Sequence, residues 1–92
     1  MAVSTLVGRV ITMATADDTY AGKGVIDFIS WVGGDTAADE AVLENTAGEV
    51  LWKASVSANG ETVTSPPFYR GLPFVGLKAE DLDSGTLYVH LR

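Results

Sequence analysis

Apolar and polar residues alternate along most of this chain with the period of two that is typical of half-buried β-strands. The alternation predicts strands over seven ranges: Leu6–Thr12, Lys23–Val32, Glu40–Asn45, Glu49–Ser57, Thr62–Ser65, Phe74–Glu80 and Thr86–Arg92. Turn residues separate these ranges about every 8–12 residues. The segment Thr36–Leu43 has a helical signal, but it is too short to predict a helix. We therefore expect an all-β chain, folded as an antiparallel β-sandwich or jelly-roll-like barrel of about seven to eight short strands.

Two of the predicted strands carry more specific expectations. Lys23–Val32 is largely apolar on both faces, which indicates a central strand or one that lies under a partner subunit. In Glu49–Ser57 the alternation places the ring of Trp52 in the core. The residues predicted to share its inward face are Val50, Ala54 and Val56.

The last predicted strand, Thr86–Arg92, separates apolar from polar side chains. Its apolar face carries Leu87, Val89 and Leu91. Tyr88 and His90 share the opposite face, which we expect to point away from the core.

Turn residues mark the connections between these strands. Asn45–Gly48 is a short loop with a glycine available for positive φ, and Asn59-Gly60 is the pair that favours a type I′ turn. Pro66-Pro67 cannot donate to a sheet ladder, so it ends the preceding strand. We expect residues 68–73 to form a loop with aromatic anchors.

The chain has 92 residues and a mass of 9.7 kDa, which leaves room for one core. We expect residues 1–92 to form a single β-sandwich domain, with residues 1–5 as a flexible N-terminal arm. The sequence contains no cysteine, which excludes disulfides, thiolate nucleophiles and cysteine-ligated zinc.

Twelve acidic and six basic residues give a net charge of −6. Such a chain repels phosphate backbones, so we expect no direct contact with nucleic acid. There is no run of about 18 apolar residues, and we expect no association with a membrane. No basic residue precedes the apolar part of the N-terminal segment, which Gly8-Arg9 interrupts, so we expect a mature cytosolic-type product without a signal peptide.

Candidate catalytic chemistry is sparse. His90 is the single histidine, and neither a cysteine nor a Gly-x-Ser-x-Gly elbow is present to pair with it. We expect His90 to be a surface or interface residue and the protein not to be an enzyme. Gly22-Lys23-Gly24 lacks the spacing of a phosphate-binding loop and predicts a turn.

The acidic residues gather in predicted turns: Asp17-Asp18, Asp35 with Asp39-Glu40, and Glu80-Asp81 with Asp83. The segment Asp81–Gly85 matches only a fragment of a calcium-binding loop. A calcium site needs about six to eight oxygen ligands. We therefore interpret these residues as solvated turn residues, and we expect neither a metal nor another cofactor.

Aromatic residues leave one alternative open, a carbohydrate-binding platform. Its candidate members are Tyr20, Trp31, Trp52, Tyr69 and Tyr88. Trp31 lies at the end of its strand, just before Gly33-Gly34, and is the better candidate for an exposed ring. A position in the core or in an interface is nevertheless the favoured interpretation of both tryptophans.

The order of several short motifs is similar to that in small all-β virion proteins of tailed bacteriophages. These are Ile29-Ser30-Trp31, the hairpin from Asn45 through Gly48-Glu49-Val50-Leu51-Trp52, Pro66-Pro67-Phe68-Tyr69, Gly76-Leu77, and Leu82-Asp83-Ser84-Gly85 followed by Thr86–Leu91. The resemblance covers about the last seventy residues, and residues 1–24 match no such pattern.

This resemblance implies a non-enzymatic capsid cement (decoration) protein that binds the outer surface of the major capsid protein and stabilises the shell. It implies location in the virion after synthesis in the cytoplasm of a host bacterium. Symmetric shells favour a closed homotrimer. A tail, baseplate or fibre component is the alternative within the same family. The candidate interface residues are Trp31, Tyr69, Arg70, Tyr88 and His90.

Overall fold

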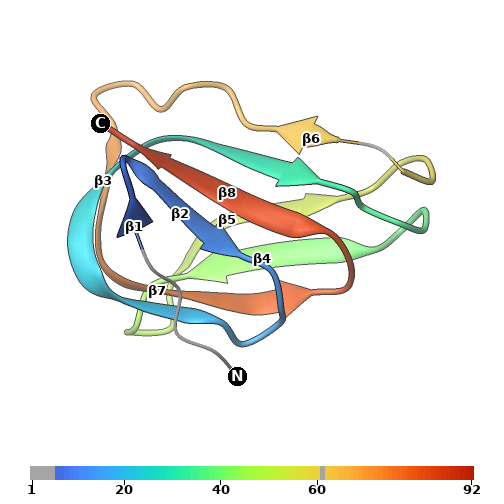
Figure 1. Cartoon of the computed structure of the whole chain (residues 1–92), viewed down its shortest axis with the longest axis horizontal. Helices are drawn as coiled ribbons and strands as arrows, with labels where there is room; N and C mark the ends of the chain where they lie inside the picture. Colours follow the sequence, from blue (N-terminus) through green and yellow to red (C-terminus); the bar gives the residue numbers. More distant parts are fainter. Residues whose placement is uncertain (1–5, 61) are drawn as a thin grey trace.

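The computed structural model describes residues 6–60 and 62–92, which form eight β-strands (Figure 1). In chain order they are β1 (Leu6–Val7), β2 (Val10–Met13), β3 (Thr19–Val32), β4 (Glu40–Glu44), β5 (Val50–Ser55), β6 (Val63–Thr64), β7 (Leu72–Leu82) and β8 (Thr86–Leu91). The described residues contain no helix, and so none long and apolar enough to cross a membrane. The predicted N-terminal arm, residues 1–5, lies outside the described residues.

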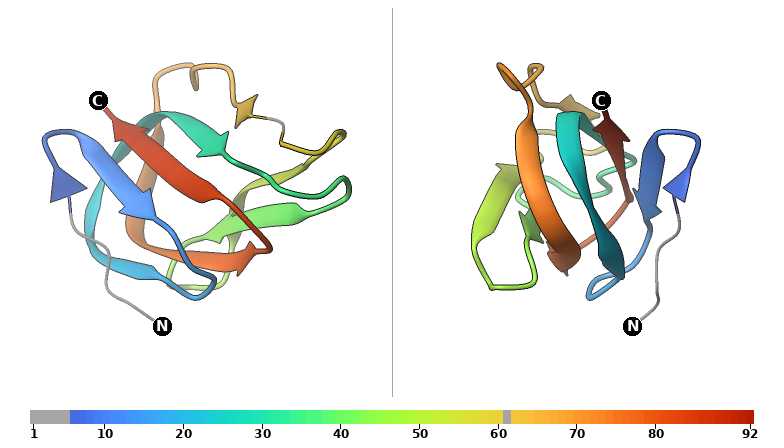
Figure 2. Two further views of the ribbon diagram at one scale, coloured as in Figure 1. Left: turned by 45° about the vertical axis from the view of Figure 1, so that its right-hand side comes forward. Right: turned by 90° about the vertical axis from the view of Figure 1, so that its left-hand side faces the viewer.

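All strand pairs are antiparallel and join into one sheet, in the order β1-β2-β8-β3-β7-β4-β5, with β6 beside β3. The first half of β3 pairs with β7, whereas its second half pairs with β8 on one side and β6 on the other. The strand bends between these halves, so that the sheet folds over itself (Figure 2). The predicted sandwich-like all-β fold is confirmed.

One apolar core fills the folded sheet. Its buried members among the described residues are Ile11, Met13, Ile26, Ile29, Trp31, Ala41, Leu43, Val56, Phe74, Leu77, Ala79, Leu82, Leu87 and Val89. The predicted alternation of β8 is correct, because Leu87 and Val89 are buried while Tyr88 and His90 are half-buried on the opposite face. Val89 pairs with a buried isoleucine on each side, so this inward row continues across β2, β8 and β3.

A β-bulge in the middle of β3 determines which of its residues face inward. Ile26 pairs with Leu91 and Phe28 pairs with His90, so Asp27 is an extra residue in the ladder. Ile26 and Ile29 are consequently both buried although they are three positions apart, and Phe28 lies on the outer side. Apolar side chains therefore lie on both faces of this strand, as expected. Because of the bulge, the residues on each face do not follow a simple alternation.

Trp31 is fully buried, so the favoured interpretation of it as a core residue is confirmed, whereas an exposed ring and its choice as a candidate interface residue are wrong. It pairs with Leu87, and its Nε1–H donates a 2.8 Å hydrogen bond to the carbonyl oxygen of Ser84. The turn after β7 thus covers the end of β3, a long-range contact that the strand pattern does not contain. Gly85 permits this approach, because it has a φ of 74° and a Cβ there would lie 2.5 Å from the carbonyl oxygen of Val32.

Trp52 points inward as predicted, but it is only partly buried. It pairs with the buried Leu43 and packs against the core. β5 is the last strand of the described sheet, so its side chains are covered from one side only. A register shift between Leu43 and Glu44 turns Val50 outward, where it is 57% exposed, and the prediction of Val50 as a core residue is wrong.

Three connections differ from the predicted ones. Gly22-Lys23-Gly24 is not a turn, because these residues lie within β3. Leu6–Thr12 is a hairpin and not one strand, because Gly8, with a φ of 63°, and Arg9 make a tight turn between β1 and β2. The turn at Asn59-Gly60 does not join paired strands, since β6 pairs with β3. β3 also begins four residues before the predicted start, and β7 is longer than predicted at both ends.

Asp18 is 5% exposed, so the interpretation of it as a solvated turn residue is wrong. Its Oδ2 accepts hydrogen bonds of 3.0 Å from the backbone N–H groups of Ala14 and Thr15. The same turn is bonded to β7 through the backbone, from Asp17 N to Ala79 O (2.7 Å) and from Ala79 N to Asp18 O (2.9 Å). Asp18 therefore fixes the connection between β2 and β3 against the neighbouring strand.

Trp31→Ala should lower the free energy of unfolding by about 3–5 kcal/mol, because it removes a fully buried ring and leaves the Ser84 carbonyl without its donor. Trp52→Ala should cost less, because that ring is partly exposed. Urea unfolding followed by far-UV circular dichroism measures both losses. An equal or larger loss for Trp52→Ala would contradict the assignment of Trp31 to the centre of the core.

Candidate functional site

The outer side of β8 and the second half of β3 carries three aromatic side chains, Phe28, Tyr88 and His90, which we call the aromatic face. The ladders place Val10 and Phe28 on either side of His90, so these side chains point outward together. The His90 imidazole stacks on the Phe28 ring, with 4.1 Å between the centroids and 10° between the planes. The three aromatic residues are half-buried, which leaves part of each ring available for contact.

Tyr88 lies one step along β8 from this stack, between Thr12 of β2 and Ser30 of β3. Ser30 also pairs with Thr64 of β6, so short hydroxyl side chains flank the tyrosine on both sides. The aromatic face therefore combines rings with small polar groups and lies over the buried row of the core. Such a surface is suited to contact with another protein surface.

A loop beside the C-terminal end of β8 carries Tyr69 and Arg70. Tyr69 is 86% exposed, and the Arg70 guanidinium lies 5.3 Å from the centroid of its ring. Arg70 and Gly71 both have positive φ, 62° and 77°, which makes the chain reverse sharply here. Phe68 anchors the loop, since its N–H donates to the Asp27 carbonyl and its own carbonyl accepts from the Gly71 N–H, each at 2.8 Å.

Arg92 connects this loop to the end of β8. Its Nη2 donates a 2.9 Å hydrogen bond to the Phe68 carbonyl, and its Nε lies 3.6 Å from Oδ1 of Asp27. Its backbone N–H donates to the Val25 carbonyl at 3.0 Å. Arg92 thus holds the loop and the bulge of β3 together.

Four of the five predicted interface residues lie at least partly at the surface, on two different features. Tyr88 and His90 are on the aromatic face, and Tyr69 and Arg70 are on the loop at its end. Trp31 lies in the core and is not part of the surface.

Phe28 and Arg92 belong to this surface but were missed in the sequence. The bulge at Asp27 decides the side on which Phe28 lies, and a strand pattern does not reveal a bulge. The role of Arg92 depends on a loop about twenty residues earlier in the chain, for which the sequence offers no signal.

The described residues offer little for catalysis or metal binding. No carboxylate of residues 6–60 and 62–92 forms an ion pair with His90, whose ring stacks on Phe28 instead. In the same ranges no three His, Asp or Glu side chains are placed so that they could hold a metal ion.

Five acidic residues lie at the opposite end of β8, and we call them the acidic end: Asp35, Asp39, Glu40, Asp81 and Asp83. Ser84 organises them, because its Oγ donates to Oδ2 of Asp39 at 2.7 Å and accepts from the backbone N–H of Asp35 at 2.8 Å. Oδ2 of Asp83 accepts a 2.8 Å hydrogen bond from the backbone N–H of Glu40.

Asp81 is the most perturbed carboxyl of this group. Desolvation by burial raises the pKa of Asp81 above its ordinary value, and the Asp83 carboxyl raises it further through a shared hydrogen bond and through repulsion. Glu40 and Glu80 add repulsion. Lys53 offsets part of this charge, since its Nζ lies 3.4 Å from Oε2 of Glu40.

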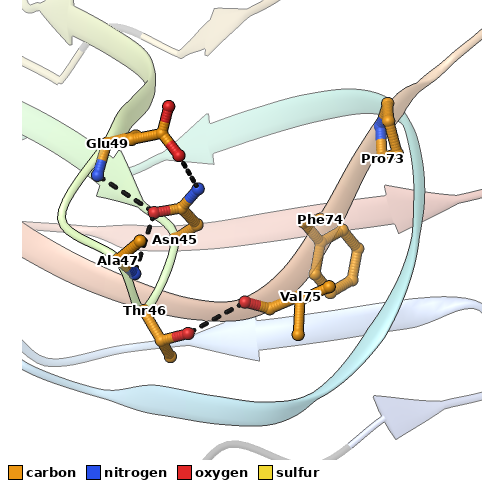
Figure 3. A pocket seen from close by; sticks show the side chains of 7 residues that line it. All are labelled: Asn45, Thr46, Ala47, Glu49, Pro73, Phe74 and Val75. Carbon is orange, nitrogen blue, oxygen red and sulfur yellow. Dashed lines mark hydrogen bonds between the residues drawn. The ribbon is translucent and has the colours of Figure 1, made fainter.

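A hollow of about 500 Å³ lies between the β4–β5 turn and β7 (Figure 3). Its lining residues are Asn45, Thr46, Ala47, Glu49, Pro73, Phe74 and Val75. Oδ1 of Asn45 accepts hydrogen bonds from two backbone N–H groups of the turn, and Oγ1 of Thr46 donates to the Val75 carbonyl, all at 3.0 Å. Glu49, the one ionisable side chain in this lining, accepts from Nδ2 of Asn45 at 3.0 Å. The bonds of Asn45 thus stabilise the turn itself, and the bond of Thr46 attaches the turn to β7.

Comparisons with models of known protein families, with curated protein sequences and with solved structures find no match for this chain.

Asp81→Asn should raise the thermal unfolding midpoint at pH 7 by about 1–4 °C, because it removes one of several facing negative charges. The pKa of Asp81 is higher in the folded chain than in the unfolded chain, so protonation favours the folded state. This stabilisation is fully present below the ordinary value of 3.8 and is lost as the pH rises through the folded value. The advantage of the variant should therefore vanish near about pH 3.

Asp35→Asn is the matched control, because it changes the net charge equally and Asp35 is not among the groups that shift the pKa of Asp81. Its midpoint should change less at pH 7. A gain from Asp81→Asn that persists at about pH 3, or an equal gain from Asp35→Asn, would contradict this explanation.

Proposed function

We propose that this chain is a non-enzymatic structural protein of a tailed bacteriophage, of the capsid cement type. It binds the outer surface of the major capsid protein and stabilises the assembled shell. The aromatic face is the observation that carries the proposal, because it is a contact surface without accompanying catalytic chemistry among the described residues. The order of turn and aromatic motifs along the sequence supports the viral assignment.

The composition of the aromatic face supports a protein partner. The centres of protein interfaces are enriched in aromatic residues and depleted in charged ones. Phe28, Tyr88 and His90 provide the rings, and Asp27, the acid beside them in β3, is paired with Arg92 at 3.6 Å. A partner that covers this face would desolvate few unpaired charges.

The rigidity of the aromatic face supports the same function. Its residues lie on paired strands of β8 and β3, directly above the buried row that contains Val89 and Ile29. A side chain that is already held in place loses less conformational entropy when a partner binds. The burial of Trp31 removes the stronger member of the alternative carbohydrate platform.

Virions of the phage that encodes this chain should contain the protein in the head fraction, in a fixed ratio to the major capsid protein. Separation of heads from tails followed by quantitative mass spectrometry measures this ratio. Detection in tails alone would replace the cement function by a tail, baseplate or fibre function. Absence from both fractions would overturn the assignment to the virion.

Phe28→Ser combined with Tyr88→Ser should weaken binding to shells that lack the protein by roughly 30-fold or more, as expected for the loss of an interface hot spot. The control Val75→Ser makes the same type of change at a residue of β7 that is 68% exposed, and it should bind as the unmodified chain does. Circular dichroism verifies that both variants fold. If the double variant is folded and binds normally, the aromatic face is not the docking surface.

A further inference from the structure

The two ends of β8 differ in charge. The acidic end lies where β8 begins, around the turn that contains Ser84 and the loop after β3 (right side of Figure 1). The strand then runs for six residues, about 20 Å, toward the C-terminus at the other end. Charged groups of opposite sign are thus separated along the length of one strand.

Basic and aromatic residues surround the far end of β8, and we call them the basic end: Arg9, Tyr69, Arg70 and Arg92. The Leu91 N–H donates to the Arg9 carbonyl at 2.7 Å, and Arg92 bonds to the loop that carries Tyr69 and Arg70. Arg9 and Arg70 are exposed and form no ion pair within residues 6–60 and 62–92. Of these three arginines, Arg92 alone is neutralised by a described acid, Asp27.

Each end also carries an exposed apolar side chain. Tyr69 is 86% exposed at the basic end, and Val32, the last residue of β3, is 42% exposed beside the acidic end. Tyrosine and arginine are the residue types that dominate interface energetics, and carboxylates are the natural partners of an arginine fork. The two ends therefore complement each other in charge and in apolar contact.

We infer that the basic end of one copy docks on the acidic end of a second copy of this chain, so that copies associate head to tail. Complementary ends on one molecule make a heterologous contact, which extends from copy to copy into a ring or a row. The aromatic face lies along the flat side of the sheet and remains free, so every copy can present it to the same underlying surface. The association is a property of this chain alone and holds whatever the aromatic face binds.

The size of the ends limits the strength of this contact. The whole molecule measures 32 × 29 × 24 Å, so each end is a small surface. A standard interface buries ~800 Å² on each partner. Charge pairs at the rim of such a contact add specificity and association rate more than affinity. The association should therefore be weak in dilute solution and become strong where a shell holds many copies close together.

Sedimentation velocity of the purified full chain, at a few hundred micromolar and about 20 mM salt, should reveal species larger than a dimer. At about 1 M salt, where the Debye length is near 3 Å, association should weaken at least tenfold. A chain that remains monomeric at low salt and this concentration would overturn the inference.

Two variants weaken one end each and separate this arrangement from a symmetric dimer. Arg9→Ser with Arg70→Asn removes the two arginines of the basic end that form no described ion pair, and Asp35→Asn with Asp81→Asn removes two of the five carboxylates of the acidic end. Each variant alone should associate at least tenfold more weakly than the unmodified chain, because every contact needs both ends. An equimolar mixture should form a dimer with one copy of each and nothing larger, since one intact end of each kind remains.

Glu44→Gln with Glu49→Gln is the control, because it changes the net charge by the same amount as the acidic-end variant but at the β4–β5 hairpin. It should assemble as the unmodified chain does. Undiminished self-association of either end variant alone, a mixture that stays monomeric, or loss of assembly in the control would each contradict head-to-tail docking. These measurements contain no shell, so their failure would leave the proposed binding to the capsid protein unaffected.

Discussion

The bend in β3, marked by one extra residue at Asp27, is the constraint on which the rest of the structure depends. It lets a single strand pair with β7 in its first half and with β8 in its second, so one sheet can close around one core. It also turns Ile29 inward while Phe28 faces outward against His90. The backbone and side chain of Asp27 then hold the Tyr69 loop and Arg92 in place. Core and contact surface thus have a common origin.

A small domain of this kind has little surface to bury within itself, and contact with other proteins adds burial that its own core cannot supply. The charges of the described residues are also distributed unevenly over the surface. Basic groups gather at one end of β8 and acidic groups at the other, while the flat side between them carries rings and hydroxyls. Surfaces of different character therefore point in different directions.

The periodicity of the sequence was sufficient to predict the all-β fold and the side of β8 on which Tyr88 and His90 lie, because alternation is a local property of a strand. It left the position of Trp31 open between core and interface, and it could not predict the hydrogen bond of this ring to a carbonyl more than fifty residues away. Nor could it predict the outward position of Val50, because register shifts arise from the pairing of strands. The same limit hid Phe28, so the contact surface was only partly visible in the sequence.

The orientation of the protein on its particle tests the central claim most directly, and a cryo-EM map of the intact virion that resolves side chains would measure it. The account predicts density for Phe28, Tyr88 and His90 against the major capsid protein, with the β4–β5 hairpin directed away from the shell. A map in which the aromatic face is open to solvent, while β4 and β5 contact the shell, would contradict it.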